Sequence, residues 1–299
     1  MKLSYWPKSL KKNKMIGLQP ITIGLFLQQH VNKHSLSRID LKALLAWATG
    51  LTQTQLITQS NRKLNSLELN QLEQAIQRRT QGEPLAYITN QKEFYSRTFY
   101  ITPDVLVPRP ETEELIDQVL TLLQAQPTAP YCIADIGCGS GVIGITLAAE
   151  LPLSTVIAID CSSKALQVAQ QNAHQLKVHN IHFYLSNIFS YFETHTPTLQ
   201  FDLIVSNPPY LAHNDPHLEQ PELKHEPQIA LTDQADGYSF YRQLAQESPK
   251  WLKNQGYLLI EHGYTQQQQI LSYLEANHWG KTTPFTDLAG LPRMILAQK

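Results

Sequence analysis

The segment from residue 131 to residue 149 constrains the fold of this chain more than any other. Residues 131–136 form a short apolar run, which is typical of a buried parallel strand. A turn with three glycines in five residues follows at 137–141, and an apolar segment of helical length continues to 149. Such a turn lets the backbone approach a ligand closely and leaves the first N–H groups of the helix free. The segment therefore predicts an α/β fold with a binding site at the end of a strand.

Strand and helix patterns alternate from residue 113 to the C-terminus. Further strands are expected at 154–159, 181–185, 201–206, 256–260 and 293–297. Ser162 is placed to cap the helix that follows the second strand. This alternation predicts a mostly parallel, Rossmann-like sheet with helices on both faces. We interpret the glutamine run at 266–269 as the solvated face of a helix.

The pattern upstream of residue 113 differs. Apolar residues at helical spacing predict a small helical domain over 21–82, with an apolar face that includes Ile39, Leu41, Leu44, Leu45 and Trp47. Aromatic and β-branched residues at 83–111 predict a β-hairpin linker. We expect 1–20 to be a flexible extension and 112–299 to form the sheet domain.

Composition excludes several classes of protein. The net charge of −1 gives no global basic field for nucleic acid. The three cysteines include no Cys-x-x-Cys pair, which favours reduced thiols in the cytoplasm. No apolar stretch approaches the ~18–20 residues of a membrane helix. His213 and His217 lie four residues apart, but Pro216 between them disfavours a helix, so we expect no metal site.

A second constraint is Asn207-Pro208-Pro209-Tyr210, which directly follows the apolar run 201–206. Open α/β sheets bind ligands just beyond the carboxyl ends of their strands. Asn207 offers an amide oxygen, and Pro208 has no N–H, so its backbone offers only an acceptor. Pro209 holds Pro208 extended, and Tyr210 supplies an aromatic face. These four residues predict a rigid cup for a planar group that carries an NH2.

Asp160 ends the second expected strand, where a carboxylate can accept hydrogen bonds from ribose hydroxyls. That placement suits a nicotinamide dinucleotide as well as other nucleoside ligands. A nicotinamide-binding turn favours the spacing G-x-G-x-x-G, whereas the third glycine of 137–141 comes one residue early. Hydride transfer also has no need of a cup for an amide. The combination with Asn207 therefore favours a different nucleoside cofactor.

Together these residues resemble the class I S-adenosylmethionine-dependent methyltransferases that methylate planar nitrogen. The segments 82–89, 92–95, 107–115, 225–227, 236–237 and 261–263 are similar to the release-factor glutamine methyltransferases, the PrmC (HemK) family. This resemblance implies methyl transfer from S-adenosylmethionine, with S-adenosylhomocysteine as product, to the Gly-Gly-Gln glutamine of class I peptide chain release factors. Such a modification would modulate translation termination. It also implies that the helical domain recognises the substrate.

The resemblance implies roles for individual residues. Asn207, Pro208, Pro209 and Tyr210 would bind the glutamine and carry catalysis, and Asn207 would also contact the cofactor. Arg109 would help close the glutamine pocket. Asp160 would bind the cofactor ribose, and its methionine part would lie against Gly137, Cys138, Gly139, Ser140 and Gly141.

One position departs from the family pattern. Where the family usually has an aspartate for the adenine amino group, this chain has Asn187, followed by Ile188 in place of a larger side chain. Asn187 can still accept through its side-chain oxygen, and Ile188 can pack on the adenine. Both are therefore retained as cofactor-binding residues.

Several alternatives remain open at the level of sequence. The same motif serves enzymes that methylate a ribosomal-protein glutamine or a nucleic-acid base. A domain that binds cofactor but has lost catalysis would be an interaction module, although the intact 207–210 segment disfavours it. We expect a monomer without direct nucleic-acid or membrane binding.

Overall fold

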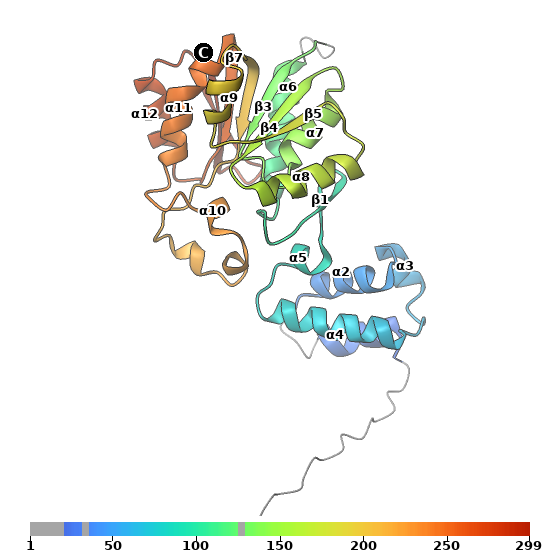
Figure 1. Cartoon of the computed structure of the whole chain (residues 1–299). Helices are drawn as coiled ribbons and strands as arrows, with labels where there is room; N and C mark the ends of the chain where they lie inside the picture. The colour runs from blue at the N-terminus through green and yellow to red at the C-terminus, as the bar shows by residue number, and fades with distance from the viewer. Residues whose placement is uncertain (1–20, 32–35, 125–128) are drawn as a thin grey trace, which may run out of the picture. The chain divides into compact units, whose positions relative to one another are not determined.

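The computed structural model describes residues 21–31, 36–124 and 129–299 of the chain. The described residues form two compact units, one that ends at Gln81 and one that begins at Gly82. Figure 1 shows both units, which are described separately below. The extension predicted at 1–20 lies outside the described residues.

The N-terminal unit is a group of four helices among its described residues: α1 (Ile23–Val31), α2 (Arg38–Thr49), α3 (Gln53–Thr58) and α4 (Ser66–Thr80). Asn65 and Glu68 form a capping box at the start of α4, because each side chain accepts the other's backbone N–H at 2.9 Å. The core of the unit includes Leu41, Leu44 and Leu45 of α2.

The predicted apolar face of α2 is wrong at two positions. Ile39 is 78% exposed and Trp47 is 37% exposed. A helix turns about 100° per residue, so Ile39 lies about 200° from Leu41, on the opposite side of α2. Trp47 lies six residues after Leu41, about 120° from it. Our prediction counted apolar residues without applying the helical period, and so it assigned both residues to the wrong face.

The C-terminal unit contains a seven-stranded sheet in the order β5-β4-β3-β6-β7-β9-β8. The first five in that order are parallel, β9 runs antiparallel to β7, and β8 pairs antiparallel with β9 at the edge. This confirms the mostly parallel sheet. In chain order the strands are β3 (Cys132–Ile136), β4 (Thr155–Asp160), β5 (Ile181–Leu185), β6 (Phe201–Ser206), β7 (Leu252–Glu261), β8 (Thr282–Thr286) and β9 (Pro292–Gln298).

Strand β8 was not expected from the sequence. It lies at the edge of the sheet, contains Pro284 and has no run of buried residues. Edge strands tolerate proline because one side of their backbone needs no ladder partner. Such a strand lacks the apolar signal that identified the others.

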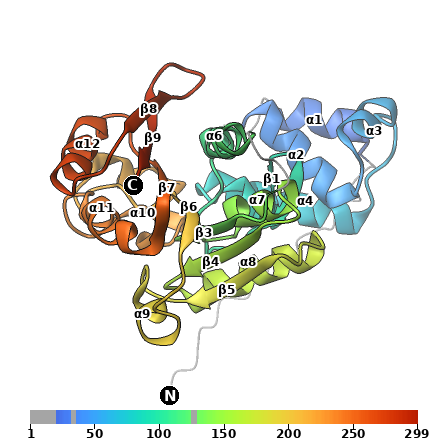
Figure 2. The ribbon, with the colours of Figure 1, turned by 90° about the horizontal axis from the view of Figure 1, so that it is seen from above.

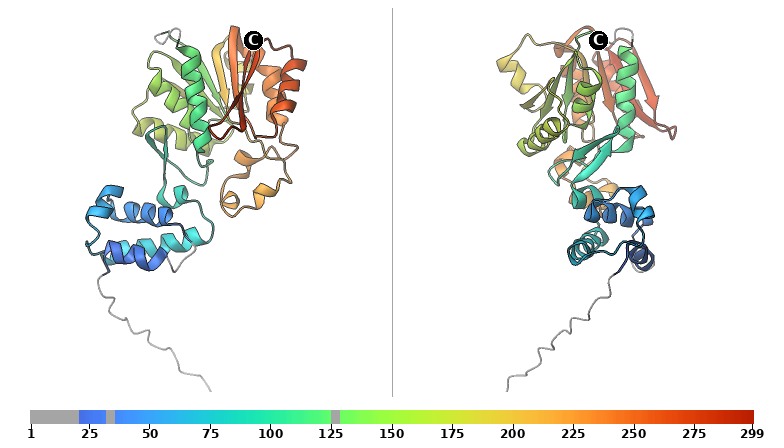
Figure 3. Two further views of the ribbon diagram at one scale, coloured as in Figure 1. Left: turned by 180° about the vertical axis from the view of Figure 1, so that it is seen from behind. Right: turned by 90° about the vertical axis from the view of Figure 1, so that its right-hand side faces the viewer.

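Helices cover both faces of the sheet (Figures 2 and 3). One hydrophobic cluster joins the sheet to α6 (Glu113–Leu123), α7 (Val142–Glu150) and α8 (Ser163–Gln175). The other joins it to α9 (Ser190–His195), α11 (Ser239–Trp251) and α12 (Gln267–Ala276). Ser162 caps α8 by accepting the N–H of Ala165, as predicted.

Two connecting segments complete this unit. The first runs through α5 (Leu85–Thr89), the antiparallel hairpin of β1 (Gln91–Phe94) and β2 (Arg97–Tyr100), and the short helix η1 (Pro110–Thr112). The second, between β6 and α11, contains η2 (Pro216–Glu219), η3 (Leu223–His225) and α10 (Gln228–Leu231). Across the described parts of the chain, none of the helices has the length and hydropathy needed to span a bilayer.

Candidate active site

The glycine turn that follows β3 depends on backbone shapes that favour glycine. Gly137, Gly139 and Gly141 have φ values of 73°, 54° and 82°, in the left-handed region. A Cβ added at Gly141 would also meet the side chain of Ile145 at 2.7 Å. The N–H of Gly137 donates to the carbonyl of Ile159 on β4 at 2.8 Å. The turn is therefore fixed against the neighbouring strand.

Asp160 holds this turn from the end of β4. Its Oδ2 accepts the N–H of Gly139 at 2.8 Å, and its Oδ1 accepts the N–H of Ser162 at 2.8 Å. Burial raises the pKa of Asp160, and the backbone hydrogen bonds oppose that rise. The carboxylate is thus fixed in orientation, and lone pairs remain for a ligand's hydroxyl groups.

Asp135 on β3 is a buried acid that our sequence analysis did not single out. Its Oδ2 accepts the N–H of Gly144 at 2.8 Å, and its Oδ1 has no hydrogen-bond partner among the described residues. Burial raises the pKa of Asp135 to about 7. The available signal was an acid inside an apolar strand, directly before the glycine turn, because such a residue is rarely buried without a partner.

A cavity opens beyond the carboxyl ends of β3, β4 and β6. It brings together six of the predicted cofactor-binding residues: Gly137, Gly139, Asp160, Asn187, Ile188 and Asn207. The side chains of Cys138 and Ser140 are buried, at 5% and 3% exposure, and neither these residues nor Gly141 line the cavity. Asp104, Val105 and Leu106 of the linker contribute to its wall.

Ile188 has an unusual backbone for a β-branched residue, with φ of 48°. Ser186 stabilises this shape, because its Oγ donates to the carbonyl of Ile188 at 3.0 Å and accepts the N–H of Tyr191 at 3.0 Å. Strained backbone of this kind concentrates at ligand sites. Here it places Ile188 in the cavity wall.

A second cavity of about 610 Å³ lies next to the first. Arg109, Tyr210 and Arg293 are among its lining residues, whereas Pro209 lines only the first cavity. Asn207 and Pro208 line both cavities. Leu106 and Ala230 also line both, so the residue pair that follows β6 is part of the boundary between the two cavities.

Comparison with known proteins is consistent with this arrangement. Residues 130–288 match the model of a methyltransferase domain, and residues 26–89 match that of the PrmC N-terminal domain. Among curated proteins, the release factor glutamine methyltransferase of Neisseria gonorrhoeae is 40% identical over 88% of this chain and 94% of its own. That of Coxiella burnetii is 38% identical over 91% and 95%. The chain belongs to the release factor glutamine methyltransferase family.

A solved structure has the same fold at lower identity. The Thermus thermophilus 16S rRNA N2 G1207 methyltransferase, in complex with AdoMet and guanosine, is 16% identical, with a TM-score of 0.50 over 70% of this chain and 49% of its own. The methyltransferase domain uses S-adenosylmethionine as its cofactor.

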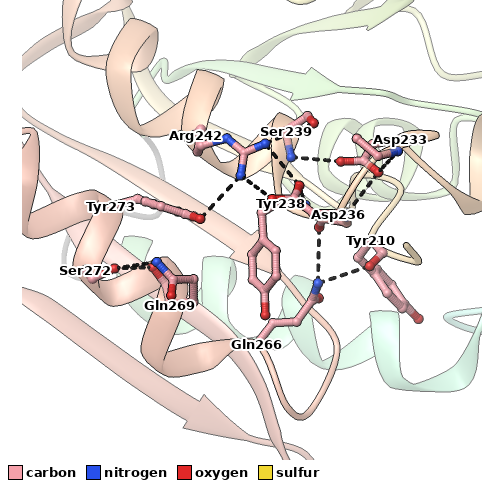
Figure 4. Close-up of polar contacts among 12 residues, drawn as sticks. Tyr210, Asp233, Asp236, Tyr238, Ser239, Arg242, Gln266, Gln269, Ser272 and Tyr273 are labelled. Carbon is pink, nitrogen blue, oxygen red and sulfur yellow. Dashed lines mark hydrogen bonds and ion pairs between the residues drawn. The ribbon is translucent and has the colours of Figure 1, made fainter. Parts of the chain in front are cut away.

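Gln266 lines the second cavity, and our sequence analysis misplaced it. It is 7% exposed, so the prediction of a solvated face is wrong for this residue. Its Nε2 donates to the carbonyls of Tyr210 and Gly237 at 3.0 and 3.1 Å (Figure 4). Its Oε1 accepts the N–H of Gly263 at 3.0 Å. Gln266 thus connects the loops that contain Tyr210, Gly237 and Gly263, next to the 207–210 segment.

Gly237 has a steric role in the same place. Its φ is 82°, and an added Cβ would lie 2.5 Å from the carbonyl oxygen of Tyr210. Asp233 fixes this loop by accepting the N–H groups of Ala235, Gly237 and Ser239 (Figure 4). The close approach explains why glycine is required in the Asp236-Gly237 motif of the family resemblance.

Arg109 lines the second cavity, and its guanidinium group forms an ion pair. Its Nη2 lies 2.6 Å from Oε1 of Glu226, whose side chain is 0% exposed. Oε2 of Glu226 accepts the N–H of Val107 at 2.9 Å, and the hydroxyl of Tyr87 donates to the carbonyl of Val105 at 2.6 Å. The linker that lines both cavities is therefore held by buried polar contacts.

The two histidines set aside in the sequence analysis have ordinary partners. His213 Nδ1 lies 3.1 Å from the carbonyl of Ala235, and His217 Nδ1 lies 2.7 Å from Oδ1 of Asp215. Within the part of the chain that the structure describes, no three His, Cys, Asp or Glu side chains gather in a way that could hold a metal ion.

Proposed function

We propose that this protein methylates the side-chain amide nitrogen (N5) of the glutamine in the Gly-Gly-Gln motif of class I peptide chain release factors. The observation that carries the proposal is the shared wall of Asn207 and Pro208 between two cavities. A methyl donor in one cavity and a glutamine in the other would meet at this wall. The family to which the chain belongs supports the choice of glutamine and of release factors.

The residues of the first cavity fit S-adenosylmethionine. The anchored carboxylate of Asp160 suits the ribose hydroxyls, and the glycine turn admits the methionine part close to the backbone. The Asn187 amide can accept from the adenine amino group, and Ile188 offers an apolar surface for the ring. When bound, the cofactor supplies an electrophilic methyl group on a sulfonium centre.

The 207–210 segment would overcome the weak nucleophilicity of an amide nitrogen. The lone pair of that nitrogen is delocalised, so its direction matters more than its basicity. The Asn207 side-chain oxygen and the Pro208 carbonyl can accept the two N–H bonds and turn the face of the amide toward the methyl group. Pro209 keeps Pro208 extended, and the partly buried Tyr210 ring would pack on the amide plane. Orientation and exclusion of water then lower the barrier.

Partner choice follows from the rest of the chain. None of the described residues of the helical unit lines either cavity, which suits a role in recognising the release factor. The net charge of −1 disfavours direct binding of nucleic acid, and on this proposal the enzyme acts as a cytoplasmic monomer.

The test is methyl transfer from labelled S-adenosylmethionine to release factor, ribosomal protein and RNA, by the wild type and by Asn207→Ala. We expect the wild type to label only the release factor, and mass spectrometry to place the methyl on the Gly-Gly-Gln glutamine. Asn207→Ala should lower turnover on the order of 10²-fold, because a positioned polar contact is lost, with cofactor affinity nearly unchanged. Label on RNA or on another residue, or near-normal turnover of the variant, would refute the assignment.

A further inference from the structure

Two polar residues outside the predicted site, Thr112 and Glu261, lie next to Asn207. Strands β6 and β7 are parallel neighbours with Ser206 opposite Ile260, so Asn207 and Glu261 lie side by side at their ends. Thr112 lies in η1, directly before α6. The Nδ2 atom of Asn207 donates to Oγ1 of Thr112 at 3.2 Å.

Glu261 is the third member of this group, beside Thr112 and Asn207. Its carboxyl group lies beside the Thr112 and Asn207 side chains, which both lower its pKa, and the residue is 2% exposed. Burial raises the pKa of Glu261 to about 7, against the opposing effects of the Thr112 hydrogen bond and of the Arg293 charge. Its Oε2 atom has no hydrogen-bond partner among the described residues. A buried carboxyl group is costly, so its place beside Asn207 calls for a compensating role.

The chemistry of an asparagine side chain suggests that role. The amide has two orientations of nearly equal shape, related by a half-turn, and only one of them presents the oxygen to a given side. The ionised form of the Glu261 carboxylate, which prevails above a pH of about 7, can only accept hydrogen bonds, so it favours the amide nitrogen and disfavours the amide oxygen. The Thr112 hydroxyl can donate its hydrogen to this carboxylate. Its oxygen lone pairs then remain to accept a hydrogen bond from the Asn207 amide nitrogen.

We propose that Glu261 and Thr112 are positioning residues that hold the nitrogen of the Asn207 amide inside the protein and thereby present its oxygen to the substrate cavity. The inference rests on the proposed function, because the presented oxygen is the acceptor for the glutamine N–H. It extends that function from the 207–210 segment to residues that touch no substrate. The reversed amide would turn the Asn207 NH2 group toward an N–H of the glutamine. The glutamine nitrogen would then have one hydrogen-bond acceptor instead of two.

Matched variants test each contact. Thr112→Val removes the hydroxyl with little change of shape, and Thr112→Ser restores it. Glu261→Gln keeps the shape of the side chain but adds an NH2 group that can donate to the Asn207 oxygen and so favour the reversed amide. For Thr112→Val and Glu261→Gln we expect kcat to fall about tenfold or more, the equivalent of one lost hydrogen bond. Thr112→Ser should retain kcat within about threefold.

Other measurements separate positioning from a purely structural role. KM for the release factor, the cofactor Kd by calorimetry and the thermal melting temperature should remain close to those of the wild type. In an Asn207→Ala background, Glu261→Gln should lower kcat no further, because residues that act through one group are not additive.

Three outcomes would overturn the inference: unchanged kcat in both variants, a loss of kcat that follows loss of folded protein, or equal losses for Thr112→Ser and Thr112→Val. The wild type in the same assay separates a failure of the proposed function from a failure of the present inference. If the wild type fails to methylate the release factor, the proposed function is wrong; if it succeeds and the variants match it, only the present inference is wrong.

Discussion

Replacing Arg109 with methionine should destabilise the C-terminal unit because it leaves a buried carboxylate without its cation. The Glu226 side chain is 0% exposed and lies 2.6 Å from Arg109, with the Val107 N–H as its other partner at 2.9 Å. Breaking a buried ion pair from one side costs about 3–5 kcal/mol. Arg109 is itself 31% exposed, so water relieves part of the loss and we expect about 3 kcal/mol. The change Glu226→Gln on top of Arg109→Met should recover most of this loss, because it removes the buried charge and keeps an acceptor for Val107.

Urea unfolding measures this effect when it is followed in the C-terminal unit alone. Trp251 and Trp279 are buried there, so tryptophan fluorescence in a Trp6→Phe/Trp47→Phe background reports on that unit. A loss below about 1 kcal/mol in Arg109→Met, or a double variant no more stable than the single one, would refute the reasoning. The double variant also tests whether Arg109 contacts the substrate. If it does, KM for the release factor should remain above the wild-type value even after stability has been recovered.

Three further predictions concern the cofactor, pH and the helical unit. Asp160→Ala should weaken S-adenosylmethionine binding by about 1.5–3 kcal/mol in calorimetry, through loss of a charged hydrogen-bond acceptor. Burial raises the folded-state pKa of Asp135 from 3.8 to about 7, so the folded state binds this proton more tightly and the free energy of unfolding falls as pH rises from about 4 to about 7. Asp135→Asn should remove up to about 4 kcal/mol of that fall in urea titrations at several pH values. A folded variant limited to residues 82–299 should bind cofactor normally but methylate the release factor at least about tenfold more slowly, and wild-type turnover of short Gly-Gly-Gln peptides should be similarly poor.

The local features of this chain were predictable because they follow local rules. The strand, glycine turn and helix at 132–150 depend on neighbouring residues and on glycine's access to positive φ. Ser162 caps its helix for the same reason, and Asn207 lies at a strand end because β6 is a mostly apolar, buried run. The carboxyl ends of parallel strands then bring Gly137, Asp160 and Asn207 together.

The contacts that were missed join residues far apart in sequence. Arg109 and Glu226 are separated by 117 positions, and Thr112 and Asn207 by 95. No periodicity or turn signal encodes such a pair, because its members meet only after the sheet has formed. Gln266 was misplaced for a related reason: a run of glutamines suggests solvent, but its first member reaches carbonyls supplied by two other loops.

The shared wall of Asn207 and Pro208 also has a consequence for the extent of modification. On the proposed function, two acceptors match the two N–H bonds of an unmodified glutamine amide. After one methyl group has been added, the nitrogen has a single N–H, and one acceptor meets a methyl instead of a donor. The product is therefore held less well than the substrate and is poorly placed for a second transfer. We expect each release factor to gain one methyl group and no more, which intact-mass measurement at long reaction times would show.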